Sequence, residues 1–261
     1  MNDETRSGKV YFIGAGPGAT DLITIRGKNI IDSADCIIYA GSLVNADLFT
    51  MSQADLYDSS GLNLDEIIEL IKAGVEQGGV VARVHTGDPS LYGATREQMV
   101  RLESLNIDFE MIPGVSSAFG AAAALGAELT LPELTQTVII TRKAGRTPVP
   151  DTERLDLLAS HGSTMMIFLS VGMIDGVVED LLKGAYTSTT PVSVVQRATW
   201  PDEKIISGTL GTIAERVRRE GINKTAMICV GPVFGTSALL AESKLYDKHF
   251  SHGTRKSISG K

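Results

Sequence analysis

The stretch Ala82–Arg96, ARVHTGDPSLYGATR, joins a strand-like run to a run with helical spacing through Gly87-Asp88-Pro89. Aspartate before proline is typical of a helix start, because the carboxylate accepts hydrogen bonds from the first free amides and proline suits the first helical position. The join also suits a ligand, since glycine lets a bound molecule come close to the backbone. Taken alone, these residues favour a helix cap and leave ligand binding open.

A second join, FIGAGPGATDLITIRG, places Gly14, Gly16 and Gly18 directly after the first strand-like run. A dinucleotide-binding fold is one interpretation, but its fingerprint is G-x-G-x-x-G, and here Pro17 stands in a G-x-G-x-G pattern. That fold also needs an acidic residue after the second strand to bind the ribose, whereas this chain has Ala40-Gly41-Ser42 there. A nicotinamide-dependent oxidoreductase is therefore disfavoured.

A third join, MIPGVSSAFGAAAALG, ends a strand at Pro113-Gly114 and offers Ser116 and Ser117 as caps for a helix of small residues. Tight packing of that helix on a sheet would by itself explain the small residues. The prediction of a ligand site rests on all three joins together. Because parallel strands end at one edge of their sheet, we expect the three joins to open at the carboxyl edge, where open α/β folds bind ligands.

Short apolar runs alternate with segments of helical spacing along the chain, which is typical of an α/β fold. In the first half, the expected strands are Lys9–Ile13, Cys36–Ala40, Val80–His85, Phe109–Ile112 and Val138–Thr141, and the expected helices are Asp65–Glu76 and Thr95–Leu105. In the second half, strands are expected at Thr164–Leu169, Val192–Gln196, Glu203–Gly208 and Ala226–Val230, and helices at Thr152–Ser160, Ile174–Lys183 and Thr212–Glu220. Strands follow one another closely there, so a mixed sheet is expected.

The stretch RKAGRTPVP contains Gly145, Pro148 and Pro150 and is the best linker candidate. We therefore expect an N-terminal α/β domain over 1–145, a C-terminal α/β domain over 146–243 and a polar tail over 244–261. The tail holds His249 and His252, and a solvated or loosely docked tail is favoured there over a metal site.

Composition narrows the classes of function. The net charge of -7 disfavours nucleic-acid binding, which needs basic surface, and no apolar run reaches the roughly 18 residues of a membrane span. The first residues lack the basic region and long apolar core of a secretory signal, so a cytoplasmic location is expected. Cys36 and Cys229 each lie in an apolar strand-like run and are expected to be buried thiols, and no metal ligand set is expected.

At the three joins the chain resembles the tetrapyrrole methylase family, whose members transfer a methyl group from S-adenosylmethionine (SAM). The matching stretches are GAGPGATDLITIRG, HTGDPSLYG and IPGVSSAFGAAA, and the resemblance extends over nearly the whole chain. More narrowly, IIYAGSLVN, TRKAGRTPVP and SKLYDKHFSHGTR are similar to the subfamily of precorrin-4 C(11)-methyltransferases, including those with cobalt-containing substrates. The resemblance implies two α/β domains with the cofactor cleft between them.

The resemblance also implies site residues. The positions that match the SAM-binding motifs of the family are Pro17, Thr86, Gly87, Asp88, Leu91, Ser116, Ser117, Ser170 and Ala198. The uroporphyrinogen-methylating relatives carry an aspartate after the tyrosine of the second strand, where this chain has Ala40 after Tyr39. No catalytic base is therefore assigned.

A tetrapyrrole intermediate carries many carboxylates, which arginine and lysine side chains bind well. Arg142, Lys143 and Arg146 are the best candidates for substrate binding, with a solvated surface as the alternative for each. His85 adjoins the Gly-Asp-Pro join, and a packed strand-end histidine is favoured there over a titrating one.

The expected function is SAM-dependent methylation of carbon 11 of precorrin-4 or cobalt-precorrin-4 in cobalamin biosynthesis, with S-adenosylhomocysteine as the product of SAM. The resemblance further implies a homodimer, and neither nucleic acid nor membrane is an expected partner. Three alternatives stay open: another tetrapyrrole methylase such as a precorrin-2 C(20)-methyltransferase, the oxidoreductase, and a non-catalytic SAM- or tetrapyrrole-binding regulator.

Overall fold

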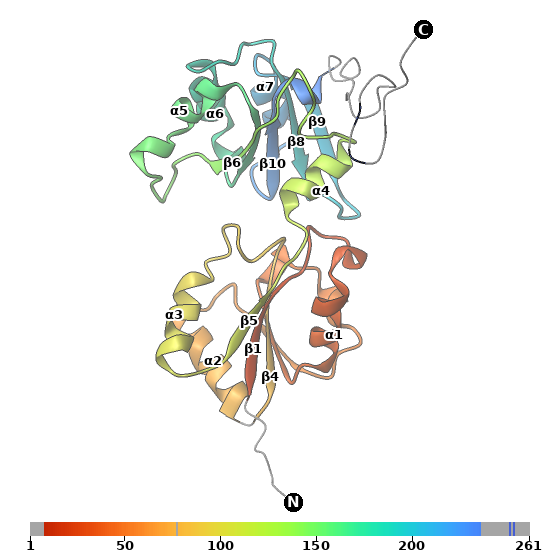
Figure 1. Ribbon diagram of the computed structural model, residues 1–261, viewed down its shortest axis with the longest axis vertical. Helices are drawn as coiled ribbons and strands as arrows, with labels where there is room; N and C mark the ends of the chain where they lie inside the picture. The colour runs from red at the N-terminus through yellow and green to blue at the C-terminus, as the bar shows by residue number, and fades with distance from the viewer. Residues whose placement is uncertain (1–7, 77, 236–250, 252, 254–261) are drawn as a thin grey trace, which may run out of the picture. The chain divides into compact units, whose positions relative to one another are not determined.

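The computed structural model describes residues 8–76, 78–235, 251 and 253 (Figure 1). Helices and strands alternate in these residues and build two five-stranded sheets, so the expected α/β class is confirmed. The chain divides into two compact units. They are Met1–Gly120 with Arg197–Glu203, and Ala121–Gln196 with Lys204–Lys261.

The first unit contains a parallel sheet in the order β3-β2-β4-β1-β5. Its strands are β1 (Lys9–Gly14), β2 (Cys36–Tyr39), β3 (Asp55–Asp58), β4 (Val80–His85) and β5 (Phe109–Ile112). Helix α1 (Ile25–Ser33) covers one face, and helices α2 (Leu64–Glu76) and α3 (Arg96–Ser104) cover the other (Figure 1). Successive side chains of a strand point to opposite faces, so Ile13 packs with the α1 side and Phe12 with the α2 and α3 side.

The second unit contains a mixed sheet in the order β6-β7-β10-β8-β9, in which only β6 and β7 run parallel. Its strands are β6 (Val138–Arg142), β7 (Thr164–Phe168), β8 (Pro191–Gln196), β9 (Lys204–Thr209) and β10 (Ala226–Val230). Its helices are α5 (Leu155–Leu158), α6 (Ile174–Leu182) and α7 (Ile213–Arg219). The core lies between the sheet and these helices, with Met165, Val177, Ile213 and Ile228 fully buried. The expected mixed sheet is confirmed.

The compact units divide the chain after Gly120, earlier than the expected division at residue 145. Strand β6 follows the first sheet in sequence but pairs with β7, with Arg142 opposite Phe168. Hydrogen-bonded pairing therefore places β6 in the second sheet, and the stretch rich in glycine and proline is a loop inside that unit. The expected helix over Thr152–Ser160 is also shorter in the structure, since the α-helix spans Leu155–Leu158 between two 3-10 turns.

Two elements of the first unit were not expected from the sequence. Strand β3 is exposed at all four positions and has no apolar run, because it lies at the edge of the sheet. Helix α1 begins after Thr24, whose side chain accepts a hydrogen bond from the Gly27 amide, and it has only a weak apolar stripe. Helix α4 (Ser117–Ala124) is the expected helix of small residues.

Both cysteines are buried free thiols, as expected. Burial raises the pKa of Cys36 to about 11 and also raises that of Cys229, so neither forms a thiolate at neutral pH. No helix in the described residues is both long and apolar enough to cross a membrane. The predictions for His249 and His252, and for the tail apart from Ser251 and Gly253, lie outside the described residues.

Candidate functional site

The three glycine-rich joins lie side by side at one edge of the first sheet. Strand β1 pairs with β4 on one side and with β5 on the other, with Gly14 opposite His85 and Ile13 opposite Ile112. All three strands run parallel, so the chain leaves each of them at the carboxyl edge. The expected convergence of the joins is confirmed, and this edge is the candidate site.

The joins are packed backbone against backbone. The Gly87 amide donates to the Gly16 carbonyl at 2.8 Å, and the Gly16 amide donates back to the Gly87 carbonyl at 3.2 Å. A Cβ atom on Gly14 would lie 2.6 Å from the Cα of Gly114, and one on Gly114 would lie 2.7 Å from the Cα of Gly14. Real Cβ atoms do not approach backbone so closely, so these two glycines allow the three joins to meet.

Asp88 links the first join, Gly87-Asp88-Pro89, to the third. Its Oδ2 accepts a hydrogen bond from the Gly114 amide at 2.8 Å, and its Oδ1 accepts from the amide of Ser90 at 2.9 Å and from the Ser90 hydroxyl. Desolvation would raise the pKa of Asp88, but these hydrogen bonds outweigh it and lower the pKa below its usual value. The side chain is therefore an ionised, fixed carboxylate at the edge of the sheet.

The helix-start interpretation of Asp88-Pro89 is wrong. Helix α3 begins only at Arg96, with Thr95 as its N-cap. The carboxylate of Asp88 instead accepts from the following turn and from the Gly114 amide of another join. Asp88 therefore holds the loops of the junction together and does not cap a helix.

Ser116 and Ser117 lie next to Gly87. A Cβ on Gly87 would be 3.4 Å from both the amide and the hydroxyl of Ser117, which is an ordinary contact distance. The φ angle of Gly87 is +62°, so the left-handed backbone and not crowding requires glycine there. Ser116 is buried, its hydroxyl accepts from the Ala118 amide at 3.3 Å, and its carbonyl accepts from Gly120 at 3.0 Å.

The segment Arg197–Glu203 completes the first unit around Pro17. The Trp200 indole N–H donates to the Pro17 carbonyl at 2.9 Å, and the Thr199 hydroxyl accepts from the Ala19 amide at 3.0 Å. The Arg197 guanidinium lies 3.9 Å above the Trp200 ring. The second join is therefore held from the side by residues far away in sequence.

In this segment only Ala198 was expected at the site from the sequence, and Ala198 is buried. Trp200 and Thr199 were not expected there, although Trp200 is the one tryptophan of the chain and an indole N–H usually finds a partner when buried. Leu91 lies one turn after Asp88, and its amide donates to the Asp88 carbonyl at 3.2 Å, while Thr86 is half-buried at the end of β4.

His85 is a packed strand-end histidine. Its side chain is 4% exposed, its ring stacks on Phe12 with centroids 6.0 Å apart, and its Nε2 has no hydrogen-bond partner among the described residues. Desolvation, with a smaller contribution from the Arg83 charge, lowers the pKa of His85 to about 3. It is therefore neutral at physiological pH and is not suited to exchange protons with a substrate.

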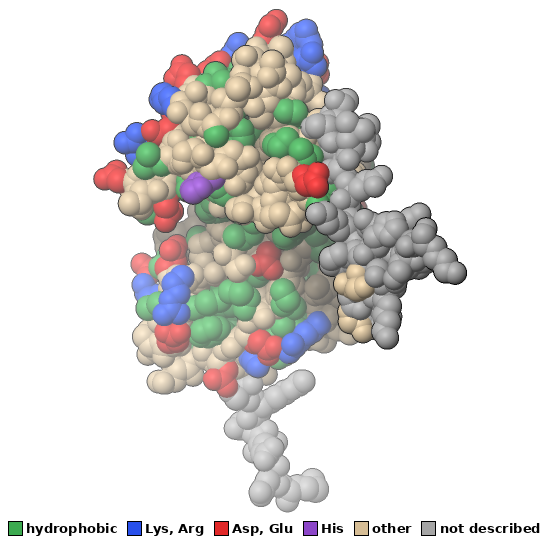
Figure 2. Space-filling view, turned by 45° about the horizontal axis from the view of Figure 1, so that its top comes forward, with side chains coloured by type: hydrophobic (Ala, Val, Ile, Leu, Met, Phe, Trp, Pro, Cys, Tyr) green, Lys and Arg blue, Asp and Glu red, His purple; other side chains and the backbone are tan. Residues whose placement is uncertain are grey.

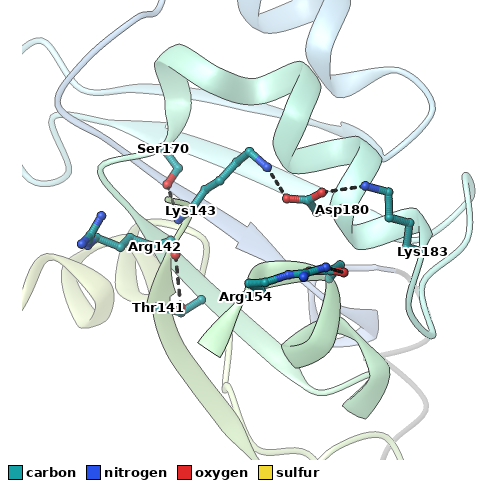
Figure 3. Close-up of polar contacts among 8 residues, drawn as sticks. Thr141, Arg142, Lys143, Arg154, Ser170, Asp180 and Lys183 are labelled. Atoms are coloured by element: carbon teal, nitrogen blue, oxygen red, sulfur yellow. Dashed lines mark hydrogen bonds and ion pairs between the residues drawn. The ribbon is translucent and has the colours of Figure 1, made fainter. Parts of the chain in front are cut away.

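Lys143 has partners inside the second unit (Figure 3). Its ammonium group forms an ion pair with Asp180, which also pairs with Lys183 at 3.0 Å. Desolvation would raise the pKa of Asp180, but the hydrogen bonds from Lys143 and Lys183 lower it. The Lys143 amide donates to the Ser170 hydroxyl at 2.9 Å, so Ser170 fixes the backbone at the end of β6.

The other two substrate candidates do not join Lys143 in a cluster. The Arg142 side chain points away from that of Lys143 in Figure 3, and its guanidinium donates to the carbonyls of Thr147 at 3.1 Å and Pro148 at 2.6 Å. Arg146 is exposed. Figure 2 shows acidic and basic side chains interspersed on the face in view, in keeping with a net charge of -7.

Comparison with known proteins assigns the family. The family model of Tetrapyrrole (Corrin/Porphyrin) Methylases matches residues 9–214. The chain belongs to the tetrapyrrole methylase family. The three joins at the edge of the first sheet thus belong to a tetrapyrrole methylase fold.

The similar proteins within the family have narrower names. A cobalt-precorrin-4 C(11)-methyltransferase of Methanocaldococcus jannaschii is 57% identical over 95% of this chain and 96% of its own length. A precorrin-4 C(11)-methyltransferase of Pseudomonas aeruginosa is 46% identical over 93% of this chain and 97% of its own. A solved cobalt precorrin-4 methyltransferase has a TM-score of 0.86 at 45% identity and covers 90% of this chain and 98% of its own.

Proposed function

We propose that this methyltransferase transfers the methyl group of SAM to carbon 11 of precorrin-4 or of cobalt-precorrin-4, as a step of cobalamin biosynthesis. The observation that carries the proposal is 57% identity with an enzyme of that name over nearly the full length of both chains. The junction of the three joins supports the choice of cofactor, since it lies at the carboxyl edge of the parallel sheet, where open α/β folds bind ligands.

The residues of the junction fit a SAM molecule. Gly14 and Gly114 allow the three joins to meet at the edge of the sheet, and Gly87 has a left-handed backbone that suits glycine. The ionised carboxylate of Asp88 places a negative charge at the same edge, which favours a cationic ligand such as a sulfonium. The amide and hydroxyl of Ser117 supply polar groups beside Gly87.

Methyl transfer from SAM requires mainly that the reacting groups are aligned. SAM supplies an activated methyl group, so the protein has to hold an electron-rich ring carbon in line with the methyl and the sulfur. Positioning of this kind is worth about 7–11 kcal/mol in well-oriented reactions. The residues at the junction suit this role, because His85 is buried and neutral and Asp88 is fixed by hydrogen bonds to Gly114 and Ser90.

The first test is calorimetric titration with S-adenosylhomocysteine, with NADH as the control. We expect one-to-one binding of S-adenosylhomocysteine alone, followed by methyl transfer to precorrin-4 or its cobalt complex under anaerobic conditions. Preference for NADH would reject the cofactor assignment. Turnover of precorrin-2 instead of precorrin-4 would reject the substrate, and binding without turnover of either would favour a regulator.

We propose that Arg142, Lys143 and Arg146 bind substrate carboxylates. Replacing all three by glutamine is expected to raise the substrate KM about tenfold, with the Kd of S-adenosylhomocysteine unchanged, because each charged contact contributes about 1.5–3 kcal/mol at most and solvent screens it. Arg142 and Lys143 also form contacts inside their own unit, so their replacement can alter its structure. The single variant Arg146→Gln tests substrate binding without removing those contacts. The exposed Arg219→Gln is the matched control, and an unchanged KM in the triple variant would reject the assignment.

A homodimer, which the resemblance implies, and a cytoplasmic location complete the proposal. Sedimentation of the purified protein at micromolar concentration tests for the homodimer, with a monomer as the contrary result.

A further inference from the structure

Arg83 is a buried cation with neutral partners. It lies on β4, two residues before the end of the strand, and is 5% exposed. Its Nη1 donates to the Ile38 carbonyl at 3.2 Å and its Nε donates to the Gln98 Oε1 at 3.0 Å. Desolvation lowers the pKa of Arg83 to about 10, so the guanidinium remains charged at neutral pH. A buried charge without a carboxylate partner destabilises a fold, so a role is to be sought for the contact of Arg83 with Gln98.

Gln98 connects Arg83 to the loop that follows Asp88. It lies in the first turn of α3 and is 3% exposed. Its Nε2 donates to the Ala94 carbonyl at 2.8 Å, while its Oε1 accepts from Arg83 at 3.0 Å. The orientation of the amide is fixed by chemistry, because a guanidinium can only donate and a carbonyl can only accept. A glutamate here could not donate to Ala94, and a lysine could not accept from Arg83.

The loop that receives this hydrogen bond is strained. Tyr92 and Ala94 have φ angles of 54° and 48°, in the left-handed region that residues other than glycine rarely adopt. Gly93 between them lies so close to Pro89 that a Cβ would be 3.2 Å from the Pro89 carbonyl carbon. Such residues are destabilising and are kept where the surroundings hold them, often at ligand sites. The loop directly follows Asp88 of the candidate site.

We propose that Gln98 and Arg83 are positioning residues of the methyltransferase. Arg83 holds Gln98, and Gln98 donates to the Ala94 carbonyl. These contacts keep the loop Leu91–Thr95 in the conformation with left-handed residues that places it next to Asp88 at the proposed cofactor site. This inference rests on the proposed function, since it takes SAM as the ligand of that junction. It accounts for a buried arginine that has no carboxylate partner among the described residues and for a strained loop beside the three joins.

The decisive variant is Gln98→Glu. Glutamate still accepts from Arg83, and as an ion pair it keeps the buried cation compensated, but it has no donor for the Ala94 carbonyl. We expect the melting temperature to be kept and the Kd of S-adenosylhomocysteine to rise about tenfold, as for the loss of one hydrogen bond. The KM for SAM should rise by a similar factor, with kcat at saturation within about twofold. The exposed Gln53→Glu makes the same charge change on the first unit and should alter neither value.

A second substitution distinguishes positioning from general destabilisation. Glycine adopts left-handed angles without strain, so adding Ala94→Gly to Gln98→Glu should restore part of the affinity. Affinity of Gln98→Glu within twofold of the wild type, or a loss that Ala94→Gly does not relieve, would overturn the inference while the proposed function stands. If Gln98→Glu does not fold, Gln98→Asn, whose shorter amide cannot reach both partners, is measured under the same criteria. Failure of the wild type to bind S-adenosylhomocysteine would instead reject both the function and the inference.

Discussion

Replacing Gly114 by alanine is expected to abolish measurable binding of S-adenosylhomocysteine and to lower the free energy of unfolding by about 1–3 kcal/mol. The new Cβ would lie 2.7 Å from the Cα of Gly14 and would overlap the carbonyl oxygen of Gly87. Both neighbours are backbone, so neither can move aside as a flexible side chain would. The second and third joins must separate, and the hydrogen bond from the Gly114 amide to Asp88 is disturbed with them. Calorimetric titration and urea unfolding measure the two effects.

The matched control for this variant is Gly61→Ala. None of the residues that the structure describes lies within 4 Å of a Cβ at Gly61, so the stability of this variant should change by less than about 0.5 kcal/mol and its affinity not at all. Normal affinity in Gly114→Ala would show that the close approach of the three joins is not needed for the cofactor. Equal losses in both variants would point to a general effect of alanine on the chain.

His85 is expected to make the first unit sensitive to acid. Its folded-state pKa of about 3 is below the ordinary value of 6.5, so the unfolded chain binds the extra proton first. The free energy of unfolding therefore falls as the pH drops through 6.5 and levels off near 3. At 1.36 kcal/mol per pH unit, this residue alone accounts for about 3 kcal/mol between pH 7 and pH 4. Asp88 acts in the same direction at lower pH, because its pKa is lowered too.

The variant His85→Met removes the histidine contribution and leaves that of Asp88. Urea unfolding at pH 7 and pH 4 should show a smaller loss of stability in this variant than in the wild type, by about 3 kcal/mol. His161→Gln, at an exposed position of the second unit, should keep the loss of the wild type. Equal losses in His85→Met and the wild type would mean that the buried imidazole is protonated in the folded protein.

Features fixed by local sequence could be predicted. The apolar runs of β4 and β10 give the same strands in the structure, because strands buried on both faces leave a continuous apolar signal. The glycines of the three joins were also readable, since left-handed angles and close backbone contact leave few other residue types possible.

Features that depend on distant partners could not be predicted. The Asp88-Pro89 pair has the pattern of a helix start, yet its carboxylate accepts from Gly114, which lies 26 residues away. Strand β6 has the same apolar pattern whichever sheet it joins, so the division of the chain was misplaced. Trp200 and Pro17 are 183 positions apart, and nothing in either stretch indicates the other. The two cations Arg142 and Lys143 looked unpaired in the sequence, because their carbonyl and carboxylate partners come from a later loop and from helix α6.

The segment Arg197–Glu203 has a consequence for how the protein is made. Synthesis on the ribosome delivers the strands of the first sheet within the first 112 residues, but the indole that contacts the Pro17 carbonyl emerges only after residue 200. Most of the second unit is therefore translated while Pro17 in the second join still lacks its contact with Trp200. A nascent chain released before that point would carry the complete first sheet without the contact between Trp200 and Pro17. Under the proposed function, the ability to bind SAM is therefore among the last properties that the growing polypeptide acquires.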